Sequence, residues 1–160
     1  MMKRILYFIG TFAYSGRSPF APGTAGSLAA LLLLLLCAGL LPAPVYAPVL
    51  SLGIVLFIAI GIPAAAYIEK NEGRTDPGLV VIDEAAGQWI TFLFIPGNML
   101  LSHPWLPVAG FLLFRLFDIF KPFPCRNAER LGGGLGIVLD DVIAGLYASV
   151  VLNLCFRFFL

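Results

Sequence analysis

The sequence predicts an all-α integral membrane helical bundle of about five transmembrane helices, with residues 1–160 forming a single membrane-embedded domain. Of its 160 residues, 60% are hydrophobic and only 12% are charged, whereas a soluble domain carries about 25% charged residues. No charged residue occurs between Ser18 and Ile68, a stretch too long for one span of about 20 residues. The alternation typical of membrane β-strands is absent, so helices are the expected spanning form.

The first two spans are expected at about Thr24–Leu41 and Tyr46–Ile68, because the run Pro42-Ala43-Pro44 breaks the apolar stretch. The polar stretch 69–77 is then a loop. Near the N-terminus, Lys3-Arg4 precede an apolar run that lacks a cleavage pattern of small residues. We therefore expect a short helix at the membrane surface and not a signal peptide.

Three further spans follow from the same reasoning. A third is expected from near Asp83 past Phe94, with Pro96-Gly97-Asn98 as its end. A fourth runs from about Trp105 to Phe120 and a fifth from about Ile137 to Phe156, joined by the loop 121–136.

Charge is distributed unevenly across this predicted topology. Nine of the ten basic residues and all nine acidic residues fall on one side, and only Arg157 lies opposite. The basic residues on the charged side are Lys3, Arg4, Arg17, Lys70, Arg74, Arg115, Lys121, Arg126 and Arg130. The positive-inside rule makes that side cytoplasmic, so we expect the chemistry there.

Five carboxylates lie at or inside predicted helix ends, where an ionised group is costly and marks a bundle interior or an aqueous cavity. They are Asp83, Glu84, Asp118, Asp140 and Asp141, whereas Glu69, Glu72, Asp76 and Glu129 lie in loops and are interpreted as solvated charge. Helix N-caps would explain one acid per helix, at Asp83 and Asp140. They do not explain an adjacent pair at each of two helix starts.

Five clustered negative charges would repel one another or take up protons without a counter-charge. Ligands that are all oxygen favour a hard ion, so the sequence predicts bound Mg²⁺. Arg115, Asp118 and Lys121 recur at i, i+3 and i+6 on one helix face, and an intrahelical salt bridge is the simpler interpretation for Arg115 with Asp118.

Two turn-rich segments could present backbone N–H groups to an anion. Arg17 precedes the run Ser18–Ser27, which contains too many prolines and glycines to be helix and is too apolar for an ordinary loop, so we expect a structured entry to the first span. The glycine run Gly132–Gly136 could act likewise or serve as a flexible linker.

Several classes of function are excluded. The single histidine, His103, falls on the side away from the charges, so a histidine nucleophile is not expected there. Cys125 lacks the C-x₅-R spacing of cysteine phosphatases, and Cys37, Cys125 and Cys155 are predicted to be free thiols. A net charge of +1 argues against nucleic acid as a partner.

Four blocks of the sequence resemble the phosphatidylglycerophosphatase A family. They are RSPFAPGTAGSL (17–28), VVIDEAAGQWI (80–90), FRLFDIFKPFP (114–124) and GGLGIVLDDVIAG (133–145), in the family's order. The resemblance implies a Mg²⁺-dependent phosphatase of the bacterial inner membrane that converts phosphatidylglycerophosphate to phosphatidylglycerol. Its partners are then the phospholipid substrate and the membrane, with no protein partner indicated.

The resemblance also implies roles for particular residues. Asp83, Glu84, Asp140 and Asp141 are expected to hold one or two Mg²⁺ ions, with Asp118 a further ligand or the base that orients water, and these five acids form the catalytic set. The expected phosphate-binding residues are Lys121, Arg17, Arg126 and Thr24.

Two other classes of protein are alternatives to this hypothesis. An ion-coupled small transporter using interfacial carboxylates would place its acids near the bilayer midplane and carry internal repeats. The acids here are predicted near one interface, and the two halves show no repeat. A cytidine-diphosphate-alcohol phosphotransferase would need a long spaced pattern of aspartates within one segment, which this sequence lacks.

Overall fold

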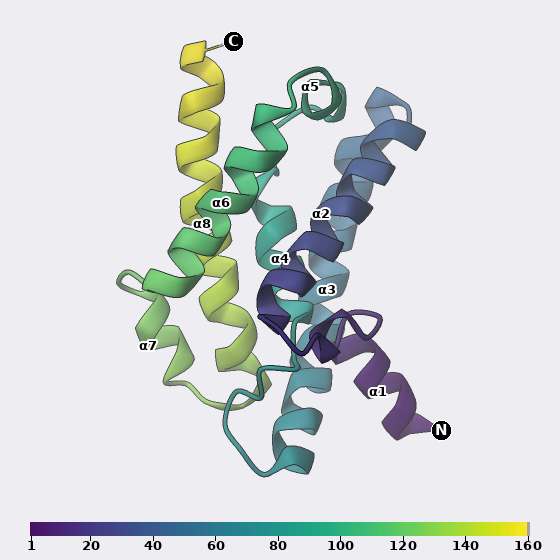
Figure 1. The fold of residues 1–160 in the computed structure, drawn as a ribbon, viewed down its shortest axis with the longest axis vertical. Coiled ribbons are helices and arrows are strands. Elements are labelled where there is room, and N and C mark those ends of the chain that lie inside the picture. Colours follow the sequence, from purple (N-terminus) through teal and green to yellow (C-terminus); the bar gives the residue numbers. More distant parts are fainter. Residues whose placement is uncertain (160) are drawn as a thin grey trace.

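The structure, a computed structural model, describes residues 1–159 and is built from helices (Figure 1). These are α1 Met2–Gly10, the 3-10 turn η1 Ser15–Arg17, α2 Pro22–Leu40, α3 Ala43–Glu72, α4 Ile82–Thr91, α5 Gly97–Ser102, α6 Trp105–Phe120, α7 Cys125–Glu129 and α8 Gly133–Phe159. No strand occurs in residues 1–159, so the all-α prediction is confirmed.

Three helices, α2, α3 and α8, are long and apolar enough to cross a membrane. Their 19, 30 and 27 residues extend about 28, 45 and 40 Å at 1.5 Å per residue, against about 30 Å of hydrocarbon core. Large apolar side chains such as Leu32, Leu52 and Val150 are more than half exposed on them. This is the expected surface of a helix that faces lipid, and the prediction of a membrane protein is confirmed.

The predicted third span is instead a short helix inside the bundle. α4 has 10 residues, about 15 Å, and packs against α2, α3, α6 and α8 at the centre of the molecule (Figure 1). Its small residues Ala85, Ala86 and Gly87 are buried and let the surrounding helices come close. α6, with 16 residues, is also shorter than a full span. About five spans are predicted, but only three helices in residues 1–159 are long enough to cross a membrane.

The largest extensions of helices beyond their predicted boundaries are at the end of α3 and the start of α8. α3 continues through Glu69 and Glu72, two acids expected in a loop, and ends at Gly73 with φ 67°. A glycine in the left-handed conformation is a common helix C-cap. α8 begins at Gly133, within the expected loop. Hydropathy marks where an apolar segment ends, whereas a helix continues into water until its backbone is capped.

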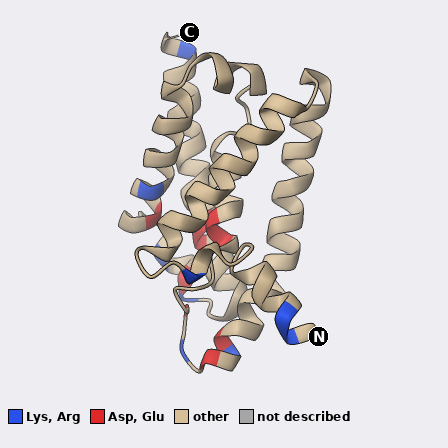
Figure 2. Cartoon of the chain, turned by 45° about the vertical axis from the view of Figure 1, so that its right-hand side comes forward, with Lys and Arg blue, Asp and Glu red and all other residues tan. Residues whose placement is uncertain are grey.

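The predicted N-terminal helix is present as α1, and it is amphipathic. Tyr7 and Gly10 are buried on one side, whereas Met2, Ile5 and Phe8 are exposed. The Gly10 carbonyl accepts a hydrogen bond from the backbone N–H of Val81 at 2.9 Å. The basic turn of α1 lies near the polar end of α3, away from the C-terminus of the chain (Figure 2).

Candidate functional site

Helices α4 and α8 pack closely through two glycines. A Cβ atom on Gly145 would collide with the Gly87 carbonyl oxygen, and one on Gly87 would collide with Phe114 and with the Asp141 carbonyl. Side chains four residues apart share a helix face. Asp83 lies four residues before Gly87 and Asp141 four before Gly145, so the helix contact brings the two acidic pairs together.

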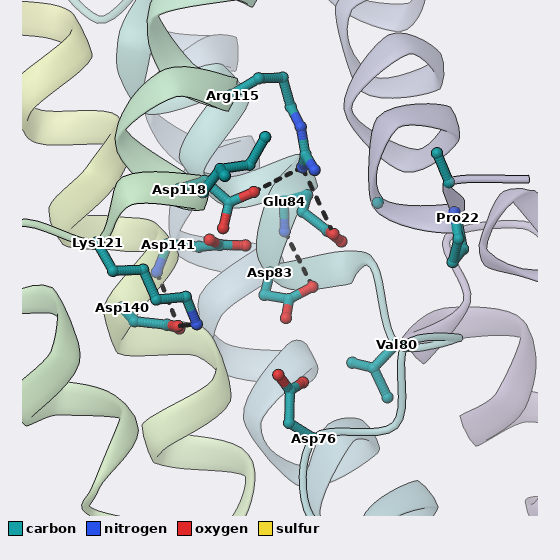
Figure 3. Close-up of a pocket in the computed structure, with 14 residues that line it drawn as sticks. Pro22, Asp76, Val80, Asp83, Glu84, Arg115, Asp118, Lys121, Asp140 and Asp141 are labelled. Atoms are coloured by element: carbon teal, nitrogen blue, oxygen red, sulfur yellow. Dashed lines mark hydrogen bonds and ion pairs between the residues drawn. The ribbon is translucent and has the colours of Figure 1, made fainter.

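Three carboxylates from these pairs form one cluster. Ligand oxygens of Asp83, Glu84 and Asp141 all lie within 4.8 Å of one another, and the three side chains converge in Figure 3. Asp83 and Asp141 are only 6% and 4% exposed. Glu84 has a buried oxygen, Oε2, with no hydrogen-bond partner in the described chain.

This cluster fits a divalent cation. Octahedral Mg²⁺ binds oxygens at about 2.1 Å, so opposite ligands lie about 4.2 Å apart, and the three carboxylate oxygens lie within 4.8 Å of one another. The orphaned Glu84 oxygen would be satisfied by such an ion, which would also offset the like charges. The residues present therefore fit a metal ion, which Asp83, Glu84 and Asp141 could hold.

Asp140, the fourth predicted metal ligand, contacts a cation instead. Its Oδ2 lies 2.6 Å from Lys121 Nζ, which also lies 3.4 Å from Glu129. Lys121 follows the last residue of α6. Burial lowers the pKa of Lys121, but the hydrogen bond that Lys121 donates to Asp140 and the charges of Asp140 and Glu129 raise it by more, so the pKa lies above its usual value.

Neither acidic pair begins with an N-cap residue. The N-cap of α4 is Val81, and Asp83 accepts the Glu84 N–H within the first turn. Asp140 lies well inside α8, which begins at Gly133. The helix-cap interpretation of Asp140 is therefore wrong, because the helix starts earlier than the apolar run.

Arg115 links α6 to α4 and α2. Its Nη1 lies 2.7 Å from Asp118 and 3.7 Å from Glu84, and it donates a hydrogen bond to Ser27 Oγ at 3.3 Å. The predicted pair with Asp118 is present, but the contact with Glu84 was not predicted. The contacts of Arg115 with Asp118 and Glu84 lie at the edge of the acidic cluster (Figure 3).

These groups line one cavity of about 360 Å³. Six carboxylates and two cations face it, with the N-terminal turn of α2 on the opposite wall; the acids are Asp76, Asp83, Glu84, Asp118, Asp140 and Asp141. Fully ionised, they exceed the cations by four charges (six minus two). The surplus is a further reason to place a divalent cation in the cavity.

Asp76 is the acid that sequence reasoning missed. The sequence predicts solvated loop charge at Asp76, yet this residue lines the cavity together with Gly78 and Val80 (Figure 3). Partial burial raises the pKa of the Asp76 carboxyl, and the charge of Lys121 lowers it by less. The sequence does carry a signal for this position. Asp76 precedes Asp83 by only a few residues, so the short loop between α3 and α4 must keep it near the start of α4.

Of the four predicted phosphate-binding residues, Lys121 alone lines this cavity. Arg17 lies 4.9 Å from the Tyr14 ring centre and borders a different cavity. Arg126 is exposed and donates to the Phe120 carbonyl at 3.4 Å. Thr24 is exposed, although the preceding Gly23 reaches the cavity wall.

The two turn-rich segments have different roles. The prediction that the run Ser18–Ser27 is not helix is wrong for residues 22–27, which form the start of α2, because a proline is tolerated in the first turn of a helix. Residues Ala21–Gly23 form a wall of the cavity, where a Cβ on Gly23 would collide with Glu84. The run Gly132–Gly136 does not border the cavity. A Cβ on Gly134 would collide with the Ile62 carbonyl, so this glycine lets α8 approach α3.

The geometry suits a small dianion. Lys121 and Arg115 line the same cavity as the three acids, so a phosphate in that cavity would meet two cationic side chains, and a cation held by the acids would add positive charge.

The chain matches a protein-family model described as Phosphatidylglycerophosphatase A over residues 8–156. It is 43% identical over 144 residues to a Bacteroides thetaiotaomicron protein named "Putative phosphatidylinositol-3-phosphatase", covering 90% of this chain and 89% of that one. It is 40% identical over 139 residues to an Escherichia coli protein and 39% identical over 136 residues to a Haemophilus influenzae protein, both named Phosphatidylglycerophosphatase A. These cover 86% and 82% of this chain and 76% of each relative. No solved structure matches the chain.

Proposed function

The chain belongs to the phosphatidylglycerophosphatase A family, and we propose that it hydrolyses phosphatidylglycerophosphate to phosphatidylglycerol and phosphate, with Mg²⁺ as cofactor. The observation that carries this proposal is the cluster of Asp83, Glu84 and Asp141 beside Lys121 and Arg115 in one cavity. The relatives named for the same activity support it.

The reaction is the hydrolysis of a phosphate monoester. Water forms a bond to phosphorus, the bond from phosphorus to the glycerol oxygen breaks, and that oxygen takes up a proton. Such transfers need positioning and charge neutralisation more than covalent chemistry from the protein. Lys121 and Arg115 are placed to bind the phosphate oxygens, since each lies on the cavity wall with its cationic group near the acids.

Asp83, Glu84 and Asp141 would hold the metal. When bound, Mg²⁺ supplies positive charge that offsets the negative charge of the phosphate in the transition state. Asp140 holds Lys121 in place through their 2.6 Å contact. Asp118, fixed by Arg115 at 2.7 Å, is placed to orient the attacking water and accept its proton.

A second candidate substrate is phosphatidylinositol 3-phosphate, because the relative that is 43% identical carries a name that refers to it. Both lipids present a phosphate monoester on a polyol head group, and a cavity of about 360 Å³ is within the usual range for small ligands. The two candidate substrates therefore differ in the polyol of the head group and share the phosphate monoester.

We also place the cavity on the cytoplasmic side, with α4 and α6, although each is shorter than a full span, carrying the chain across the bundle and back between α3 and α8. Nine of the ten basic residues lie on that side of the predicted topology. A cysteine in the loop 73–78 should then be shielded from an impermeant thiol reagent in intact cells, whereas one at Asn98 should react. The reverse labelling would overturn the orientation.

Phosphate release by the purified protein from each lipid, at equal surface concentration in mixed micelles, tests the substrate. We expect kcat/KM to be higher for phosphatidylglycerophosphate. Preference for phosphatidylinositol 3-phosphate would overturn the head group while keeping the phosphatase, and no release from either lipid would overturn the proposed function.

A further inference from the structure

A second cavity, of about 400 Å³, lies where α1 and the turn around η1 meet the C-terminal end of α3. Lys3, Arg4 and Arg17 line it together with two tyrosines and the last residues of α3. It shares no lining residue with the carboxylate cavity. The proposed hydrolysis uses none of its residues.

This second cavity carries an excess of positive charge. Three cations face one acid, Glu72, and none of the three forms an ion pair among residues 1–159. Glu72 is held at the wall, because Tyr7 donates a hydrogen bond to its Oε1 at 2.5 Å and Asn71 donates one to the Tyr7 oxygen at 2.6 Å. The free cations leave a formal surplus of two charges (three minus one), which suits an anion.

The tyrosine rings help to fix these cations. Lys3 Nζ lies 5.6 Å from the Tyr7 ring centre, and the Arg17 guanidinium lies 4.9 Å from that of Tyr14. Cations near aromatic faces at these distances are attracted to the ring. Two of the three cations are therefore held at the cavity rim.

An uncovered apolar stripe runs along α1 beside the cavity. Met2, Ile5 and Phe8 recur every third residue and are 70%, 51% and 49% exposed. A helix with a basic side and an exposed apolar side is typical of one that lies in the headgroup region of a membrane. The cavity thus combines sites for a negative headgroup and for the hydrocarbon attached to it.

We propose that Lys3, Arg4 and Arg17 bind the phosphate of an anionic phospholipid, whose acyl chains lie against the apolar stripe of α1. This lipid is bound and not hydrolysed, since the metal-binding carboxylates lie in the other cavity. The assignment depends on the geometry of α1 and not on the proposed function. A soluble phosphate would use the cations but leave the stripe uncovered.

Binding of phosphatidylglycerol, a phosphodiester without a terminal phosphate, tests the site. Native mass spectrometry in phosphatidylcholine-containing micelles would count lipid adducts on the wild type and on a Lys3→Gln/Arg4→Gln/Arg17→Gln variant. We expect apparent affinity to fall at least about tenfold, because each cation near a membrane surface contributes to anionic lipid binding.

A matched control removes three charges outside the cavity, at Lys70, Arg74 and Arg130, each changed to Gln. Affinity should stay within about twofold of the wild type, whereas an equal loss in both triple variants would mean nonspecific surface charge and would overturn the site. A Lys3→Arg/Arg4→Lys/Arg17→Lys variant should retain binding, which separates the loss of charge from misfolding. Loss of binding in this charge-conserving variant, with an unchanged melting temperature, would contradict a site built on charge.

Two further arms identify where the bound phosphate comes from. Glycerol 3-phosphate has the anionic group without acyl chains and should compete only weakly with phosphatidylglycerol. Competition as strong as that of the lipid would overturn the lipid assignment in favour of a soluble phosphate. The Asp83→Asn/Asp141→Asn variant should keep the adduct. Loss of the adduct in that variant, but not in the Lys3→Gln/Arg4→Gln/Arg17→Gln variant, would place the lipid in the carboxylate cavity and overturn the second site.

Discussion

Gly145 of α8 packs against the backbone of Gly87 of α4, and a Cβ on Gly145 would collide with the Gly87 carbonyl oxygen. Each helix carries an acidic pair about one turn before this contact, Asp83-Glu84 on α4 and Asp140-Asp141 on α8. The close approach of the two backbones is therefore what gathers the carboxylates, and it links the packing of the bundle to its chemistry.

Gly145→Ala should push α8 away from α4, because the added methyl meets rigid backbone. We expect a loss of about 1–3 kcal/mol in stability, the usual cost of overpacking, and a fall in phosphate release of at least about tenfold. Gly39→Ala is the control, since nothing lies within 4 Å of a Cβ there. Thermal melting in detergent and a phosphate assay would check both variants; a fully active Gly145→Ala would contradict the role of the contact.

The pair Lys121–Asp140, with its 2.6 Å contact, should behave as a unit. Lys121→Gln alone should lower activity by about 10²-fold, the usual effect of losing a group that stabilises transition-state charge. If Asp140 acts by positioning Lys121, the double variant with Asp140→Asn should be no worse than the poorer single variant. Losses that multiply would instead return Asp140 to the metal-ligand role expected from the sequence.

Arg115→Lys keeps the charge but removes the guanidinium that reaches Glu84, Asp118 and Ser27. A lysine cannot span these three groups at once, so kcat should fall at least about tenfold. Arg130→Lys, at an exposed position, serves as the control and should be silent. Equal kcat in both variants would mean that the bridge has no part in the reaction.

Asp76→Asn should lower kcat/KM, because Asp76 faces the carboxylate cavity. The sequence alone predicts a silent change at this acid. Glu69→Gln is the matched control, since Glu69 does not border that cavity. A kinetic comparison of the two variants decides between these expectations, and identical wild-type values for both would restore the interpretation of Asp76 as solvated charge.

The sequence predicts the helical membrane fold and the gathering of acids well, because apolar length and buried charge are local signals. The doublets Asp83-Glu84 and Asp140-Asp141 stand out on that ground alone. The same signals overestimate α4, since a buried helix of Ala, Gly and Ile has the composition of a span without its length.

The cationic side of the site was harder to predict, since it depends on directions that the sequence does not carry. Arg17 stands beside a loop that borders the carboxylate cavity, yet its side chain turns to Tyr14. Asp140 and Asp141 are neighbours, but a helix turns each residue by about 100°, so Asp141 joins the cluster while Asp140 contacts Lys121. The relative placement of α4, α6 and α8 decides that Asp141, and not Asp140, faces the carboxylate cluster.

The Mg²⁺ dependence of phosphate release by Asp141→Asn tests the central claim most directly. Asn keeps the size of the side chain but removes the charge that holds the ion. We expect the wild type to be inactive in excess chelator and restored by Mg²⁺, and Asp141→Asn to lose at least about 10²-fold in rate while needing more Mg²⁺ and melting as a folded protein. Full wild-type activity in chelator, or an unchanged rate and Mg²⁺ dependence in Asp141→Asn, would contradict a metal site formed by Asp83, Glu84 and Asp141.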